Sequence, residues 1–196
     1  MSSTARAGRR AAVSTTDLAL IATFAALIAV CAIMPAFNTG SGTPFTLQMF
    51  GIFLAGATLG ATRGFLAVVL YLAVGTAGLP IFTQGAAGPA TWAGVTGGYL
   101  LAFPIAALIV GLVAARIARS DPARFVVVVS VVAAVVTVAV VGTLGTLGMA
   151  WKLDVSLRVA WGYATPFFVY DIIKGVLAAI VAASVHRAFP QLTARR

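Results

Sequence analysis

Charged side chains are scarce in this sequence of 196 residues, and glutamate is absent. Charged residues make up 9% of the chain, against about 25% in ordinary soluble domains. Hydrophobic residues make up 61%, and the mean hydropathy is +1.07. A soluble domain of this length could not bury so much apolar surface, because its ratio of surface to volume is too high. The composition therefore excludes a soluble enzyme and a disordered chain, and it indicates a protein whose main solvent is lipid.

Side chains that bind metals or carry out catalysis are also rare. The only cysteine, Cys31, lies in an apolar run, so the chain can form no internal disulfide. There is a single histidine, His186, and the sequence has no G-x-x-x-x-G-K-[ST] phosphate loop, no Ser-His-Asp set and no H-E-x-x-H motif. We therefore expect a protein that is not an enzyme, does not hydrolyse ATP itself and holds neither a metal nor a cofactor.

Six apolar segments predict membrane-spanning helices. A spanning helix needs about 17–25 residues, because the hydrocarbon core of a bilayer is about 30 Å thick. The predicted spans cover residues 18–34, 47–62, 64–77, 97–117, 125–147 and 163–185. Only Arg63 separates the second from the third, so these two form either a tight hairpin or one long kinked run. Backbone groups in lipid must be paired within the segment, and the fold class is therefore an all-α integral membrane bundle of six helices.

The basic residues lie at the ends of the apolar segments rather than in one continuous patch. The net charge of +9 therefore points to a membrane and not to nucleic acid. With six spans, ten basic residues fall on the side of the two termini, namely Arg6, Arg9, Arg10, Arg63, Arg116, Arg119, Arg124, Arg187, Arg195 and Arg196. Only Lys152 and Arg158 fall on the other side. The positive-inside rule then places both termini in the cytoplasm, with tails over residues 1–16 and 189–196 and a multi-pass domain of the cell membrane over residues 17–188.

Two predicted outer loops, residues 37–46 and 79–96, carry no charge and are rich in glycine, proline, threonine and aromatic residues. Two interpretations remain open for them. Such a loop folds back over the bundle and shields a site, or it is a plain glycine-rich connector at the membrane interface.

Asp171 and Lys174 are the only charged residues inside the predicted sixth span. A spacing of three residues places both on one face of a helix, and since lone charges at that depth are costly, we expect them to pair and to face the bundle interior. The pair either locks helices together or binds a neutral ligand that presents N–H and C=O side by side, such as a cyclic urea. A metal is not expected, because no second carboxylate lies near Asp171.

Aromatic residues of the outer half could complete a pocket around this pair. They are Trp92, Tyr99, Tyr163, Phe167, Phe168 and Tyr170. Such side chains suit a small, mostly apolar ligand, whereas the alternative is the aromatic belt of any membrane protein. Gln48, at the start of the second span, offers both a donor and an acceptor to a ligand, or else a hydrogen bond that caps a neighbouring helix.

Five spaced motifs carry a resemblance to a known family. They are PFTLQ at residues 44–48, LAGATLGATRG at 54–64, YLAVGTAGLPIF at 71–82, GVTGGYLLAFP at 94–104 and PFFVYDIIKG at 166–175. In this order they resemble the BioY family, the biotin-specific substrate-binding (S) components of energy-coupling-factor (ECF) transporters. The family loop usually reads G-P-T-G-G-Y, and here Val95 replaces the proline.

The resemblance implies a six-helix S component that binds biotin near the outer face, with the outer loops as a lid. Asp171 and Lys174 match the D-x-x-K motif of the last helix, which contacts the ligand. The expected substrate-binding residues are Asp171, Lys174, Tyr170, Trp92, Thr96, Tyr99, Gln48 and Phe167. The implied partners, besides the lipid bilayer, are a transmembrane coupling protein and ATP-binding subunits. Ala22 and Ala26, spaced as small-xxx-small residues of the first span, match the contact with the coupling protein.

The predicted function is therefore that of the S component for biotin uptake. Asp171 would accept a hydrogen bond from a ureido N–H while Lys174 donates to the ureido carbonyl. The opposite arrangement, in which Lys174 takes the carboxylate, remains open. Two other functions also remain open: an S component for another vitamin, which the Val95 departure suggests, and a structural membrane protein in which the ion pair only locks helices.

Overall fold

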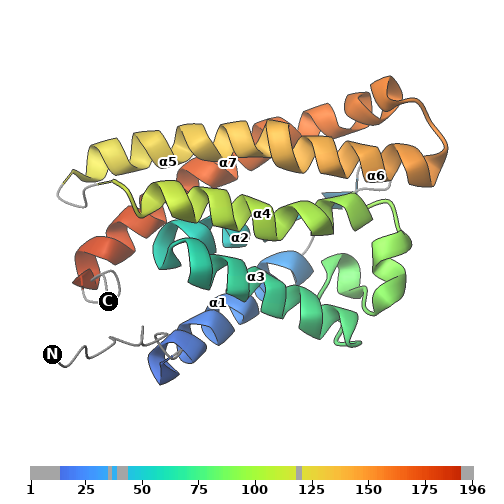
Figure 1. Ribbon diagram of the computed structural model, residues 1–196. Helices are drawn as coiled ribbons and strands as arrows, with labels where there is room; N and C mark the ends of the chain where they lie inside the picture. Colours follow the sequence, from blue (N-terminus) through green and yellow to red (C-terminus); the bar gives the residue numbers. More distant parts are fainter. Residues whose placement is uncertain (1–13, 35–36, 39–43, 118–120, 191–196) are drawn as a thin grey trace, which may run out of the picture.

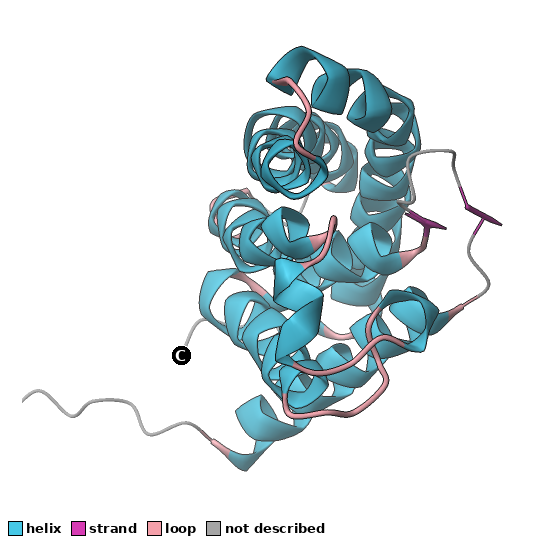
Figure 2. Ribbon diagram, turned by 90° about the vertical axis from the view of Figure 1, so that its right-hand side faces the viewer, coloured by secondary structure: helices cyan, strands magenta, loops and turns pink. Residues whose placement is uncertain are grey.

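The computed structural model describes residues 14–34, 37–38, 44–117 and 121–190, and helices dominate this part of the chain (Figure 1). The elements in chain order are α1 (Thr15–Ile33), β1 (Phe37–Asn38), β2 (Pro44–Phe45), α2 (Gln48–Leu59), α3 (Ala61–Thr76), η1 (Thr83–Gly85), η2 (Pro89–Ala93), α4 (Gly97–Ala114), α5 (Pro122–Val136), η3 (Thr137–Gly142), α6 (Thr143–Leu153) and α7 (Leu157–Ala188). The predicted all-α class is confirmed, and the described residues add to it only one short antiparallel pair, β1 and β2, with Phe37 opposite Phe45. Figure 2 shows this short pair at the edge of the helical bundle.

All six predicted spans correspond to helices. Four helical segments are long and apolar enough to cross a membrane: Thr15–Ile33, Gly97–Ala114, Pro122–Leu153 and Leu157–Ala188. The second and third predicted spans are the shorter apolar helices Gln48–Leu59 and Ala61–Thr76. The 32 residues of α7 rise about 48 Å at 1.5 Å per residue, so this helix is longer than a bilayer core of about 30 Å is thick.

The break between the second and third spans lies at Gly60, not at Arg63. Gly60 has φ +81° and ψ −176°, a conformation open almost only to glycine. The two helices then pack against each other, since a Cβ on Gly64 would lie 2.8 Å from the Cα of Gly56. A sharp turn, rather than one long kinked run, therefore joins α2 to α3.

The start of α1 has a capping box that the predicted start at residue 18 overlooked. The Ser14 hydroxyl accepts a hydrogen bond from the Asp17 amide at 3.2 Å, and the Asp17 carboxylate accepts one from the Ser14 amide at 3.0 Å. The same carboxylate forms an ion pair with Arg63 at 2.6 Å. The start of α1 is thus tied to the first turn of α3, which gives the charge of Arg63 a partner beside the Gly60 turn.

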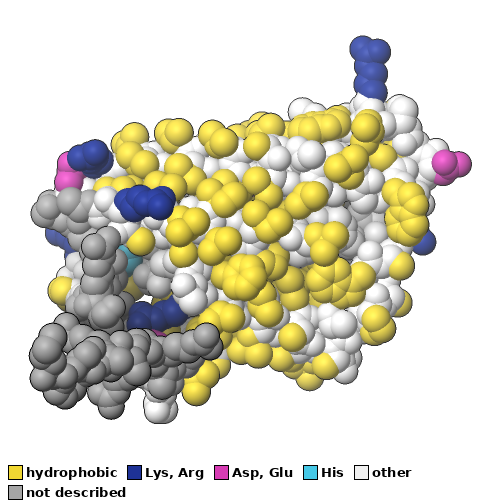
Figure 3. Space-filling view, in the orientation of Figure 1, with side chains coloured by type: hydrophobic (Ala, Val, Ile, Leu, Met, Phe, Trp, Pro, Cys, Tyr) yellow, Lys and Arg dark blue, Asp and Glu magenta, His cyan; other side chains and the backbone are white. Residues whose placement is uncertain are grey.

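Charged side chains gather at the two ends of the molecule, and hydrophobic side chains cover the length between them (Figure 3). On α5, Val127, Val131 and Val135 are 57–61% exposed and follow one another at four-residue intervals. A row of exposed valines of this kind suits contact with lipid rather than water. Of the ten basic residues that set the predicted orientation, Arg6, Arg9, Arg10, Arg119, Arg195 and Arg196 lie outside the described residues.

Helix α2 lies at the centre of the packing. All of its residues except Phe50 are buried, and it contacts α1, α3, α4 and α7. Glycine allows the closest of these approaches, because a Cβ on Gly56 would overlap the carbonyl oxygen of Ala107 in α4. The close packing of α2 against four helices therefore holds its first residues firmly in position at the site.

Candidate ligand-binding site

A cavity of about 290 Å³ opens between the first turns of α2 and α4, the η1–η2 loop, and α7. It lies toward the end of the bundle opposite the start of α1 and the end of α7 (Figure 1). The lining residues are Thr46, Gln48, Met49, Phe82, Thr83, Gln84, Ala86, Thr91, Val95, Thr96, Tyr99, Leu100, Phe103, Val141, Phe167, Asp171 and Lys174. Only two of these are charged, Asp171 and Lys174.

The two charged residues form an ion pair on the cavity wall, as their spacing predicts. The Lys174 Nζ donates to the Asp171 Oδ1 at 2.7 Å, and 13% of each side chain is exposed. Both residues belong to α7, so the bond joins no two helices. The interpretation that this pair locks helices together therefore loses its geometric basis. A carboxylate and an ammonium group side by side can instead accept from and donate to one ligand.

Phe167 shares this face of α7, because it precedes Asp171 by four residues and Lys174 by seven. Its ring stacks on that of Phe45, from the end of β2, with centroids 4.2 Å apart and an angle of 16°. The Lys174 Nζ lies 5.9 Å from the centroid of the same Phe45 ring. The segment before α2 thus lies directly over the ion pair, and its aromatic ring gives the pair an apolar neighbour.

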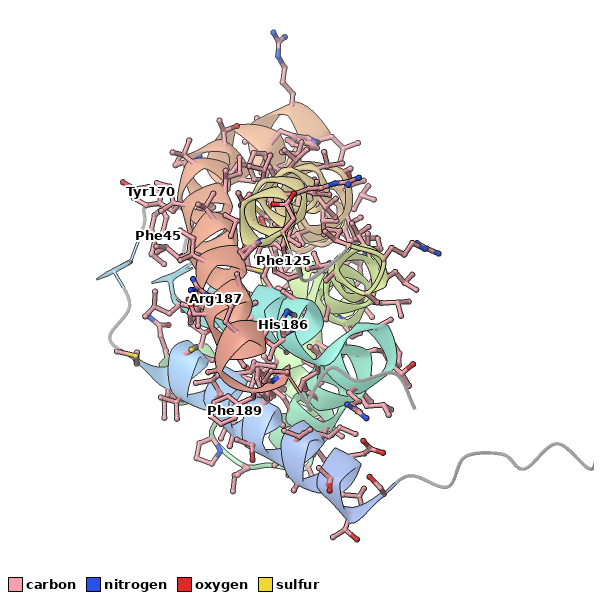
Figure 4. The ribbon with its side chains drawn as sticks, turned by 90° about the vertical axis from the view of Figure 1, so that its left-hand side faces the viewer. Phe45, Phe125, Tyr170, His186, Arg187 and Phe189 are labelled. Atoms are coloured by element: carbon pink, nitrogen blue, oxygen red, sulfur yellow. The ribbon has the colours of Figure 1, made fainter. Side chains whose placement is uncertain are left out.

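Tyr170 lies off the cavity wall. It is 53% exposed and packs edge-on against Phe45, with centroids 4.6 Å apart. Figure 4 shows the two side chains next to each other on one flank of the bundle. Tyr170 directly precedes Asp171, and neighbouring helical residues point about 100° apart. Its place in the structure is therefore beside Phe45, outside the set of residues that line the cavity.

Gln48 lies on the wall and is held on both sides. Its Nε2 donates to the Tyr71 hydroxyl at 2.9 Å, and its Oε1 accepts from the Thr83 hydroxyl at 3.3 Å. The Tyr71 hydroxyl in turn donates to the carbonyl of Ile81 at 3.3 Å. This chain of bonds links α2, α3 and the η1 loop, so Gln48 joins separate elements around the cavity rather than capping one neighbouring helix.

The segment between α3 and α4 folds back over the bundle, which decides between the two interpretations of this uncharged loop. Phe82 is 1% exposed, and a Cβ on Gly75 would lie 2.5 Å from its ring. Phe82 also meets the Tyr71 ring edge-on at 5.5 Å. Several other residues of the loop line the cavity, namely Thr83, Gln84, Ala86, Thr91, Val95 and Thr96.

Trp92 is the second predicted site residue that lies off the cavity wall. It is half-buried, and its indole Nε1 donates to the Thr76 hydroxyl at 2.9 Å. This bond fastens η2 to the last turn of α3. Trp92 therefore holds the loop in place and does not face the space that the loop encloses.

Thr96 and Tyr99, from the G-V-T-G-G-Y segment, both lie on the wall. The Tyr99 hydroxyl is buried and has no hydrogen-bond partner within the described part of the chain. Val95, the residue that departs from the family motif, also lines the cavity.

Sequence reasoning overlooked several wall residues, notably Thr46, Met49, Leu100, Phe103 and Val141. Thr46 belongs to the quoted PFTLQ motif, so the motif contained a usable signal for it. Val141 belongs to η3, a π-helical segment within the long α5–α6 helix. Such segments are common at functional sites, but a run of valines in the sequence does not predict a π-helical segment.

The sequence model of the BioY family matches residues 4–191. This chain belongs to the BioY family. The similar proteins include the "Putative biotin transporter BioYB" of Bacillus subtilis (strain 168), 35% identical over 181 residues that cover 90% of each chain. They also include the "Biotin transporter BioY" of Rhizobium etli, 32% identical over 185 residues that cover 93% of this chain and 99% of the relative.

A solved structure supports the BioY fold. It is the crystal structure of the S-component for biotin from an ECF-type ABC transporter, with a TM-score of 0.81 and 24% sequence identity. The match covers 88% of this chain and 91% of that one. The predicted S-component fold of the BioY chain is thereby confirmed.

Proposed function

We propose that this BioY chain is the biotin-binding S component of an ECF transporter and serves biotin uptake across the cytoplasmic membrane. The observation that carries the proposal is the Asp171–Lys174 ion pair on the wall of an otherwise uncharged cavity. The names of the similar proteins support biotin as the ligand. A component of this kind binds its substrate and is not an enzyme.

The chemistry of biotin fits the polar and the apolar residues that line this cavity. The ureido ring presents N–H donors beside a carbonyl acceptor, which match the carboxylate of Asp171 and the ammonium of Lys174. The fused sulfur-containing ring and the alkyl chain suit the apolar wall that Phe167, Phe103 and Leu100 provide. Each hydrogen bond to a charged group contributes about 1.5–3 kcal/mol. Several such bonds together with a buried ring are enough for nanomolar affinity, about −12 kcal/mol.

The orientation of biotin in the cavity has one alternative. Lys152 and Arg158 are exposed and lie off the cavity wall, so Lys174 is the one cation among the lining residues. The carboxylate of biotin therefore either points toward the open mouth or takes Lys174 itself. Lipoic acid separates the two cases, since it has the same acid chain and no urea. Desthiobiotin keeps both the urea and a carboxylate chain, so we expect it to compete with biotin in either orientation. We expect lipoic acid not to compete, and competition by lipoic acid would support the reverse orientation.

The partners and the orientation in the membrane belong to the same proposal. Ala22 and Ala26 are exposed on α1, while Ile21, Ala25 and Ile28 face the bundle. An exposed pair of small residues lets another helix approach closely, which suits a transmembrane coupling protein. The basic residues on the side of the two termini favour a cytoplasmic location for both. ATP-binding subunits supply the energy for transport.

Equilibrium binding tests the proposed function. The full chain, purified in detergent, is titrated with radiolabelled biotin, and desthiobiotin, thiamine and riboflavin are added as competitors. We expect saturable binding of biotin that thiamine and riboflavin leave unchanged. Preference for another vitamin would favour the second candidate, an S component of changed specificity, for which the position of Val95 on the cavity wall is the motivating observation.

A further inference from the structure

The buried hydroxyl of Tyr99 needs a partner. It belongs to a residue of the cavity wall and makes no hydrogen bond to any described residue. Leaving a buried hydroxyl unpaired is costly, so such groups in native proteins are nearly always satisfied by protein, water or ligand. The place of Tyr99 on the cavity wall makes a polar atom of the bound ligand the natural partner.

The ring that carries this hydroxyl is placed by a glycine of α6. A Cβ built on Gly145 would overlap three ring carbons of Tyr99, the Cδ1, Cε1 and Cζ atoms. Any side chain at position 145 would therefore displace the ring. Glycine inside a helix is less stable than alanine, so its presence here is best explained by this close approach.

Moving α4 away to relieve such a clash would break a close contact between two helices. The first turn of α4 lies backbone to backbone against α6, because a Cβ on Gly98 would overlap the carbonyl oxygen of Leu144. A Cβ on Gly148 would in turn lie 2.9 Å from the Cα of Gly98. The two helices run side by side here (Figure 1), and their contact fixes the distance from the Tyr99 backbone to α6.

We propose that Gly145 is a positioning residue for the ligand. Its missing side chain lets the Tyr99 ring lie flush with α6, and this position aims the hydroxyl at a polar atom of the bound molecule. Gly145 is not among the residues that line the cavity, so it acts only through Tyr99. The inference rests on the proposed function, since biotin is the ligand that tests it.

A double-mutant cycle on the full chain tests this role. Biotin dissociation constants are measured for the wild type, Tyr99→Phe, Gly145→Ala and the double variant, with Gly162→Ala as control because a Cβ there would meet open space. Tyr99→Phe should weaken binding about tenfold, the usual scale of one hydrogen bond. Gly145→Ala should weaken it at least as much, and the double variant should bind no more weakly than Gly145→Ala alone. Losses that multiply to about a hundredfold, or full affinity in Gly145→Ala, would overturn the proposal.

The failure of the two proposals can be told apart. If the wild type and Gly162→Ala bind no biotin, the proposed function is wrong; if both bind and Gly145→Ala binds as they do, only the role of Gly145 is wrong. Should Gly145→Ala yield little folded protein, a Tyr99→Leu background gives the alanine room. Recovery of folded protein there supports the steric contact, and lack of recovery contradicts it.

Discussion

The two halves of α7 pack in different ways, although one helix runs from Leu157 to Ala188. The half from Gly175 onward, which is the inner half in the proposed orientation, buries small residues, namely Gly175, Ala178, Ala179, Ala182 and Ala183. Here the helices meet closely, and a Cβ on Gly175 would lie 2.8 Å from that of Ala133 in α5. The outer half also buries Ala160 and Ala164, but it adds Phe167 and Asp171 beside a cavity. The inner half thus forms a tightly packed base, whereas Phe167 and Asp171 of the outer half border a cavity.

Polar groups follow the same division. At the inner end, His186 is buried against the edge of Phe125, and its Nε2 lies 3.1 Å from the carbonyl oxygen of Thr58 (Figure 4). The cavity beside it measures about 10 Å³, room for about one water molecule. In the outer half, the ion pair and Tyr99 line a cavity almost thirty times as large. In the proposed function, the polar groups at the larger cavity serve a ligand, whereas His186 serves packing.

The largest expected effect lies in the outer half. Lys174→Met leaves the Asp171 carboxylate on the wall without its partner and removes a donor to the ligand. We expect a loss of about 2–5 kcal/mol in biotin binding free energy. Lys152→Met is the matched control, because Lys152 is exposed at the end of α6. Equal biotin affinity of the two variants in equilibrium titration would contradict the division between the halves.

The next effect belongs to the tight base. Gly56→Ala puts a methyl group onto the backbone of α4 at Ala107, and overpacking of this kind costs about 1–3 kcal/mol of stability. Thermal unfolding without ligand should show a lower melting temperature, while Gly162→Ala, whose Cβ meets open space, should leave it unchanged or raised. A melting temperature of Gly56→Ala at or above the wild-type value would show that the base is not tightly packed.

The smallest effect is expected in the loop over the cavity. Trp92→Phe keeps an aromatic ring at this position and removes the hydrogen bond to Thr76, which is worth about 0.5–1.5 kcal/mol. Because Trp92 holds the loop and lies off the wall, we expect biotin to dissociate up to about tenfold faster with little change in the rate of association. Stopped-flow displacement measures both rates. A loss of affinity as large as that of Lys174→Met would place Trp92 in direct contact with the ligand.

Helical spacing predicted that Asp171 and Lys174 share one face of a helix, whereas Phe167 was predicted from the aromatic composition and the family resemblance. Phe167, Asp171 and Lys174 follow one another at intervals of four and three residues, so one face of a helix carries all three. By the same helical spacing, Tyr170, which directly precedes Asp171, points to a different side of the helix. Composition could not make that distinction, because it counts an aromatic residue on any face as a candidate for the pocket.

Other features depend on contacts between distant residues and could not be read from local sequence. The charge of Arg63 made it the predicted break between the second and third spans. In the structure, Arg63 lies in the first turn of α3 and pairs with Asp17, and the turn is at Gly60. Trp92 is held by Thr76, a partner sixteen residues away. The contact between the Tyr99 ring and Gly145 joins residues of two separate helices. In each case a partner far along the chain decided the outcome.

The most direct test removes both charges of the α7 pair at once. Asp171→Asn combined with Lys174→Met leaves no unpaired buried charge, so the variant should stay folded, with a ligand-free melting temperature near that of the wild type. Its equilibrium binding of radiolabelled biotin is measured in detergent at concentrations that saturate the wild type. The account predicts no detectable binding. Binding with wild-type affinity by the folded double variant would contradict it.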